Sequence, residues 1–159
     1  MESLEHNVEA LRIIQAFAEL PPARLRLVAQ AAEEVHFDAG EVIVRQGDPG
    51  DAVYALTKGE AEVWLMDAQK APVLLRTMGS GHLFGETAVL YQGLRSATIK
   101  AKTDVTALKV SGQEFLGLLR STPGLALQVA VILAQRLASD RHTLAADPTA
   151  SRPPDDVAR

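Results

Sequence analysis

The distribution of glycine constrains the possible folds of this chain more than any other feature of its sequence. Of the 11 glycines, none lies in residues 1–39, and ten lie between Gly40 and Gly117. Glycine destabilises helix interiors and is common in tight turns. The distribution therefore predicts a helical segment, then a central region of short strands joined by turns, then a second helical segment.

The first segment, residues 1–33, has apolar residues at helical spacing. They form two sets separated by Pro21-Pro22, which marks a turn and can open a helix, because proline is tolerated in a first helical turn. The first set is Val8, Leu11, Ile14 and Ala18, and the second set is Leu25, Val28 and Ala29. We expect two short amphipathic helices here.

The central segment, residues 34–111, consists of short β-rich runs separated by turn residues. The runs are VHF, EVIVRQ, AVYALT, AEVWLM, PVLLRTM, SATIKA and DVTALKV. Strands at intervals of roughly 8–12 residues are typical of a sandwich, jelly roll or small barrel. The predicted fold class is therefore α+β: an antiparallel β-roll or jelly roll of about eight strands, flanked by N-terminal helices and two C-terminal helices.

The third segment, residues 112–144, contains two predicted helices. Ser111 and Glu114 have the spacing of a capping box, which predicts a helix over about 112–120. The next helix can begin at Thr122-Pro123. Its first half is apolar on nearly all sides, so it needs the sheet, a ligand or a second copy of itself as a partner. Residues 145–159 contain prolines and no periodicity, and we expect a disordered tail.

Charge and composition exclude several classes of function. The formal net charge of −4 gives no general attraction to nucleic acid or to an anionic membrane. The chain has no cysteine, which excludes disulfides, iron–sulfur clusters and cysteine nucleophiles. Its N-terminus is acidic, and no apolar run reaches the ~18–20 residues that span a bilayer. We expect a cytoplasmic protein that binds neither nucleic acid nor membranes.

The segment 84–98, FGETAVLYQGLRSAT, interrupts the β region and carries the clearest functional signal. Its first part has space for one or two helical turns. Such a helix would leave the amides of Glu86, Thr87 and Ala88 free at its N-terminus, and free amides together with the helix dipole attract anions. The segment therefore predicts an anion site.

Two charged side chains narrow the identity of that anion. Arg95 can grip two phosphate oxygens with its planar guanidinium. Glu86 would repel a phosphate, but a carboxylate can accept hydrogen bonds from a ribose hydroxyl, as in other nucleotide sites. Amides, Arg95 and Glu86 together predict a site for a phosphate joined to a ribose.

At this segment the sequence resembles the cyclic nucleotide-binding domain family, which includes the catabolite activator protein and the regulatory subunits of cyclic AMP-dependent kinase. Residues 84–98 fit the family's phosphate-binding cassette: Phe-Gly-Glu, a small helix, then Arg, a small residue and Ala. The resemblance extends over about residues 14–141 and includes AGE at 39–41, QGDPGD at 46–51 and KGE at 58–60. It implies a protein that binds a cyclic mononucleotide reversibly.

The resemblance also implies roles for individual residues. Glu86 would hold the ribose 2′-hydroxyl, and Arg95 would hold the cyclic phosphate. The other predicted ligand-binding residues would offer backbone amides or, at the serine, a hydroxyl group: Gly85, Thr87, Ala88, Ser96 and Ala97.

Three residues are expected to support the site. Asp51 matches a family position that braces the cassette arginine. Val89 and Tyr91 lie where packing would change when the ligand pulls the short helix inward, and this change would reposition the terminal helix. The family commonly has an aliphatic residue at the position of Thr87. This difference affects the packing of the cassette and no ligand contact.

The function implied by the resemblance is that of a stand-alone regulatory module that signals through its C-terminal helix, with cyclic AMP favoured over cyclic GMP. We expect no catalysis and no metal, because the four histidines are scattered singly. The output would pass to an unknown effector protein, and a homodimer through the C-terminal helix is a further expectation. The alternatives are an interaction module on the same fold that binds no nucleotide, a transcription regulator and a phosphodiesterase.

Overall fold

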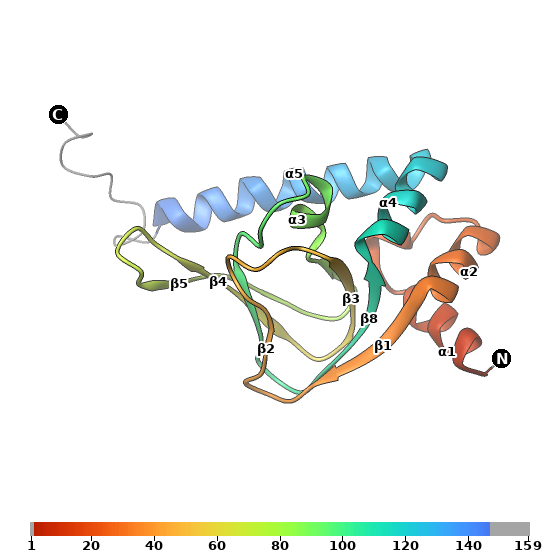
Figure 1. Ribbon diagram of the computed structural model, residues 1–159, viewed down its shortest axis with the longest axis horizontal. Helices are drawn as coiled ribbons and strands as arrows, with labels where there is room; N and C mark the ends of the chain where they lie inside the picture. The colour runs from red at the N-terminus through yellow and green to blue at the C-terminus, as the bar shows by residue number, and fades with distance from the viewer. Residues whose placement is uncertain (1, 147–159) are drawn as a thin grey trace.

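Eight strands form two four-stranded antiparallel sheets that face each other (Figure 1). The computed structural model describes residues 2–146. The strand orders are β1-β8-β3-β6 and β2-β7-β4-β5. The strands are β1 (Ala32–Phe37), β2 (Val42–Val44), β3 (Ala52–Lys58), β4 (Ala61–Met66), β5 (Pro72–Met78), β6 (Leu83–Phe84), β7 (Thr98–Ala101) and β8 (Val105–Ser111). The predicted α+β class with eight antiparallel strands between helical segments is confirmed.

The last strand, β8, pairs with the first strand, β1, and also with β3. It lies between β1 and β3, with Thr106 opposite His36 on one side and Val110 opposite Val53 on the other. Successive side chains of a strand point to opposite faces of the sheet. Accordingly, Val105 and Ala107 of β8 are buried between the sheets, whereas Leu108 and Val110 are buried beneath the helices.

The N-terminal segment forms the α-helices α1 (Glu2–Leu11) and α2 (Pro22–Ala31), with the 3-10 helix η1 (Gln15–Phe17) between them. The two short helices are confirmed. However, Ile14 and Ala18, which continue the helical spacing of the first set, lie beyond the end of α1. Ile14 has an extended backbone and a fully buried side chain, and the amide of Gln15 donates to the carbonyl of Gly81 (2.9 Å). This packing turns the chain where the spacing alone predicts more helix.

Two helices follow β8, namely α4 (Gly112–Ser121) and α5 (Pro123–Ala146). The predicted cap at Ser111 is confirmed, because its hydroxyl accepts a hydrogen bond from the amide of Glu114 (3.2 Å). In Figure 1, α5 runs along the molecule from α4 toward β4 and β5. The sequence predicts a disordered tail from residue 145, but α5 continues to Ala146. Residues 147–159 lie outside the described part of the chain.

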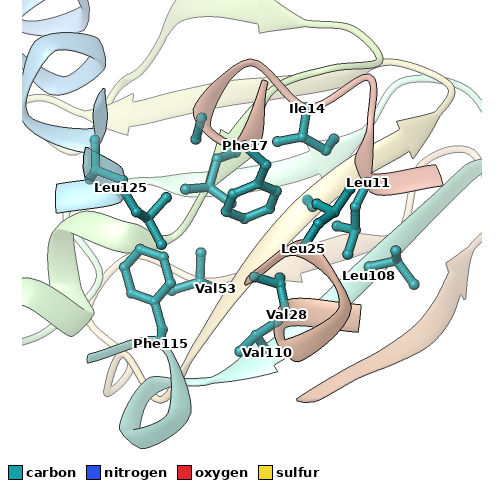
Figure 2. Packing of buried hydrophobic residues seen from close by; sticks show 14 of the residues in the cluster. Leu11, Ile14, Phe17, Leu25, Val28, Val53, Leu108, Val110, Phe115 and Leu125 are labelled. Carbon is teal, nitrogen blue, oxygen red and sulfur yellow. The ribbon is translucent and has the colours of Figure 1, made fainter. Parts of the chain in front are cut away.

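The protein has one hydrophobic core between the two sheets. Another core lies between the helices and the β1-β8-β3-β6 sheet (Figure 2). In it, Phe115 of α4 and Leu125 of α5 lie near Val53 and Phe17. Leu125, Val129 and Ile132 anchor the first half of α5 in this core. In contrast, none of the side chains from Leu133 to Ala145 is fully buried. The two halves of α5 are therefore attached to the molecule in different ways.

We expect Gly59→Ala to destabilise the protein more than Gly40→Ala. Both glycines have a φ of +91°, so alanine carries a similar backbone strain at each site, of order 1–3 kcal/mol. A Cβ at Gly59 would lie 2.1 Å from the carbonyl oxygen of Asp104, whereas no atom lies within 4 Å of a Cβ at Gly40. Urea unfolding followed by circular dichroism measures both changes. Equal losses in the free energy of unfolding would contradict the expectation.

Candidate functional site

The segment 84–98, called the cassette from here on, contains the helix α3 (Glu86–Leu90) between β6 and β7. The helix begins after Gly85, whose φ of +86° is a left-handed conformation that favours glycine. A Cβ on Gly85 would lie 2.8 Å from Nη1 of Arg95 and 3.1 Å from the carbonyl oxygen of Ala52. Glycine is therefore required here both by the backbone and by the close approach of Arg95.

Arg95 is held by backbone atoms in the interior of the site. Its side chain is 5% exposed, with Nη1 donating to the carbonyl of Gly85 (2.7 Å) and Nη2 to the carbonyl of Ala52 (2.8 Å). The main chain of Arg95 is tied to a neighbouring loop, since its amide donates to the carbonyl of Asp48 (2.7 Å). These bonds orient a buried guanidinium without neutralising its charge.

Asp51, the predicted brace of Arg95, contributes less to this arrangement than the two carbonyls. Its Oδ1 lies 3.8 Å from Nη2 of Arg95, beyond hydrogen-bond distance, and its side chain is 85% exposed. Solvent therefore screens its charge strongly.

Glu86 is buried and has a partner that the sequence did not reveal. Nη1 of Arg136 donates to Oε1 of Glu86, and Nη2 donates to the carbonyl of Leu83. The Arg136 side chain comes from α5 and is 12% exposed, against 3% for Glu86. Burial lowers the pKa of the Arg136 guanidinium, while the Glu86 carboxylate opposes this shift. The helix that covers the site thus forms an ion pair inside it.

A second ion pair joins α5 to the roll one helical turn later. Nη1 of Arg76, on β5, donates to Oδ1 of Asp140 (2.5 Å). Nε of the same arginine is buried and has no hydrogen-bond partner among the described residues. Beyond Leu133, which packs partly buried against the helical core, the second half of α5 is therefore attached by charged and polar contacts at Arg136 and Asp140.

A small cavity of about 50 Å³ brings the predicted ligand-binding residues together. All seven of them line it, together with side chains from β2, β4, β5, β7 and α5: Gly85, Glu86, Thr87, Ala88, Arg95, Ser96 and Ala97, with Val44, Val63, Arg76, Ile99 and Arg136 among the others. Sites for small molecules usually measure about 300–1,000 Å³. A nucleotide would therefore require this cavity to widen.

The supporting residues Val89 and Tyr91 do not line this cavity. Val89 is buried in the core beneath the helices. The ring of Tyr91 is 58% exposed, and its hydroxyl donates to the carbonyl of Leu94. Val89 thus joins α3 to the helical core, whereas Tyr91 closes the turn that leads to Arg95.

The histidines are less scattered than the sequence suggests. Nε2 of His6 lies 2.9 Å from one oxygen of Glu34, and Nε2 of His36 lies 3.3 Å from the other. The sequence shows four single histidines, but the fold brings His6 of α1 and His36 of β1 to the same carboxylate. Nevertheless, the described residues contain no group of three His, Asp or Glu side chains placed to hold a metal ion.

Within residues 2–146, no single helix is long and apolar enough to cross a membrane. Only α4 and α5 taken together, which are bent by 114° at their junction, reach the required length and hydropathy.

Residues 34–122 match the family model described as Cyclic nucleotide-binding domain. The chain is similar to a cAMP-dependent protein kinase regulatory subunit of Emericella nidulans, with 38% identity over 115 residues, which covers 68% of this chain and 27% of that protein. The chain spans about a quarter to a third of the length of the first curated relatives that it matches.

Solved structures show the same architecture. The catabolite activator protein of Thermus thermophilus superposes with a TM-score of 0.73 and 30% identity, covering 82% of this chain and 61% of that one. The regulatory subunit of a cAMP-independent protein kinase A from Trypanosoma brucei superposes with a TM-score of 0.75 and 25% identity, covering 84% of this chain and 48% of that one.

We expect Glu86 and Arg136 to be strongly coupled in unfolding. Removing either charge leaves the other buried without its partner, which costs about 3–5 kcal/mol. Glu86→Gln and Arg136→Gln should each lower the free energy of unfolding, and the double variant should lose less than the sum. The exposed pair Glu5 and Arg26 (2.8 Å) is the matched control, with a coupling below about 1 kcal/mol. Additive losses at positions 86 and 136 would contradict the expectation.

Proposed function

Because the chain belongs to the cyclic nucleotide-binding domain family, we propose that it binds a cyclic mononucleotide reversibly, with cyclic AMP favoured over cyclic GMP. One observation carries the proposal: a buried guanidinium, held by two backbone carbonyls, lies in a cavity with the N-terminus of α3. An oriented cation whose nearest carboxylate, Asp51, is 3.8 Å away and 85% exposed suits a ligand that carries a single negative charge.

Arg95 has the capacity to bind the phosphate without leaving its carbonyls. A guanidinium has five N–H groups, and the bonds to Gly85 and Ala52 use two of them. The remaining N–H groups can donate to the exocyclic oxygens of a cyclic phosphate. The Ser96 hydroxyl and the amides at the start of α3 line the same cavity and would complete the coordination.

Glu86 would accept a hydrogen bond from the ribose 2′-hydroxyl. Its carboxylate lines the same cavity as Arg95, so the two side chains can contact neighbouring parts of one ligand. A buried carboxylate needs hydrogen-bond donors, and a ribose hydroxyl is one. This assignment explains why a carboxylate is buried close to a phosphate site.

Similarity to a cAMP-dependent kinase subunit supports the choice of adenine. Structural similarity to a kinase subunit described as cAMP-independent supports testing other bases with equal weight. Cyclic GMP is therefore the first comparison ligand.

The proposed module catalyses no reaction and passes its signal through α5 to an effector on another polypeptide. The second candidate is an interaction module on the same fold that binds no nucleotide. The small cavity and the Arg136 bond to Glu86 favour this candidate. If Arg95→Ala left the binding of the effector intact and insensitive to nucleotide, the second candidate would replace the first.

We expect Arg95→Ala to weaken binding of cyclic AMP by about 10- to 100-fold, because a charge-assisted hydrogen bond contributes roughly 1.5–3 kcal/mol. Isothermal titration calorimetry with cyclic AMP and cyclic GMP measures the loss and the base preference. Arg12→Ala is the matched control, since it removes the same charge from an exposed position directly after α1. Equal affinities of the Arg95→Ala and wild-type proteins, or no binding of either nucleotide, would contradict the proposal.

We also propose that α5 pairs with α5 of a second copy. Six exposed residues repeat at intervals of three and four along the helix: Leu127, Ala130, Val131, Ala134, Leu137 and Ala138. At about 100° per residue they form one stripe, opposite the face that carries Leu125, Val129 and Arg136. Apolar stripes of this spacing are typical of paired helices.

We expect Leu137→Glu to convert a dimer into monomers, because it replaces a large exposed apolar side chain of the stripe with a charge. Sedimentation velocity over a range of protein concentrations measures the change, with an expected increase in the dissociation constant of at least about tenfold. Leu74→Glu, at an exposed position on β5, is the matched control and should leave the dimer intact. A wild-type protein that stays monomeric at every concentration would contradict the pairing.

A further inference from the structure

We propose that Arg136 competes with the nucleotide for Glu86, so that α5 occupies part of the ligand site until a nucleotide displaces the arginine. The inference rests on the proposed function and adds a residue to the site that regulates it. Competition predicts that removing Arg136 strengthens nucleotide binding, which is the opposite of what a residue that merely supports Glu86 would do.

Two hydrogen bonds place Arg136 in the site. Arg136 spans Glu86 and the carbonyl of Leu83, so it crosses the entry to α3. It donates to Oε1 of a carboxylate that is 3% exposed. The cavity beside Glu86 measures about 50 Å³, several times less than a usual ligand site, so in the arrangement that keeps this contact there is no room for a ribose at Glu86.

The charges around Glu86 also favour displacement of Arg136. A ribose hydroxyl is neutral, so it can replace Arg136 as a donor to Glu86 but cannot replace it as a counter-ion. Displaced from Glu86, the guanidinium would lose its anionic partner at a place where burial already disfavours its charge. Arg76 lies close enough to disfavour it further, and Asp140, the other carboxylate that favours the charge, is already paired with Arg76. Arg136 must therefore leave this position when a nucleotide binds.

The structure offers a space that can receive the displaced side chain. A second cavity of about 230 Å³ lies between α5, β5 and η1 and is lined by Arg136 itself. Polar side chains on its wall include Gln15, Gln135 and Ser139. Arg76 and His82 also line this cavity, so a displaced guanidinium would take the side of Gln15, Gln135 and Ser139, whose oxygens can accept hydrogen bonds. Rotation into this side of the cavity would release Glu86.

Loss of the contact would loosen the second half of α5. Between Leu133 and Ala145 no side chain is fully buried, and the ion pairs of Arg136 and Asp140 attach this half to the roll. The first half stays anchored in the core through Leu125 and Ile132. Nucleotide binding therefore opposes attachment of the second half of α5 to the roll. The equilibrium constant of each process is lowered by the other by the same factor.

The first arm of the test uses the full chain without nucleotide. Hydrogen exchange measured by mass spectrometry should be faster at residues 133–145 in Arg136→Gln than in the wild type. Arg120→Gln, an exposed position on α4, is the charge-matched control and should leave this exchange unchanged. Arg136→Lys keeps the charge and loses the two-pronged contact, so it provides a folded variant if Arg136→Gln is too unstable. Unchanged exchange in both Arg136 variants would overturn the proposal.

The second arm titrates the same variants with cyclic AMP and cyclic GMP. Arg136→Gln should bind at least about fivefold more tightly than the wild type, the lower end of usual coupling between sites, with Arg136→Lys between them. Binding by the wild type with no gain, or with a loss, in the variants would overturn the competition alone. Binding by no variant would overturn the proposed function together with the competition, while the exchange arm would still report on the attachment of α5.

Discussion

The burial of the Arg95 guanidinium between two backbone carbonyls is the constraint on which the site depends. A buried cation must be hydrogen-bonded throughout, so the carbonyls of Gly85 and Ala52 have to point at it. Gly85 can do so only in a left-handed conformation that leaves no room for a side chain. β3, the start of α3 and the strand entry at β7 are thereby positioned around one side chain, whose charge remains available to an anion.

Sequence reasoning was most successful where the determinants are local. The predicted ligand-binding residues are close in sequence, and one short helix and one turn bring them to a single cavity. Arg136 was not predicted because it lies 50 residues from Glu86, on a helix whose sequence indicates only an apolar face. Which residue of that helix reaches Glu86 depends on how the helix packs across the roll. Likewise, the chain leaves the helical path at Ile14, and the following Gln15 donates to the carbonyl of the distant Gly81, a contact that helical spacing cannot reveal.

α5 combines two kinds of attachment that respond differently to a ligand. Apolar burial at Leu125 and Val129 is non-directional, so no small polar molecule can substitute for it. The bond between Arg136 and Glu86 is directional and uses groups that a hydroxyl can satisfy. A single helix can therefore remain part of the folded domain at one end and exchange partners at the other. No hinge sequence is needed for the two ends of α5 to respond differently, because they differ in the kind of contact that attaches them.

The pairing of β8 with both β1 and β3 has a consequence for how the protein acquires its structure. Thr106 of β8 lies opposite His36 of β1, so the first sheet closes only when segments far apart along the chain meet. The loop between β1 and β8 must close before the contacts that it allows have formed. The conformational entropy lost on closure is therefore not yet compensated, and this slows folding. During synthesis, β1 and β3 would emerge long before their shared partner. The nascent chain would then hold exposed strand edges until β8 leaves the ribosome, and this interval would be the period of greatest exposure to aggregation and to chaperones.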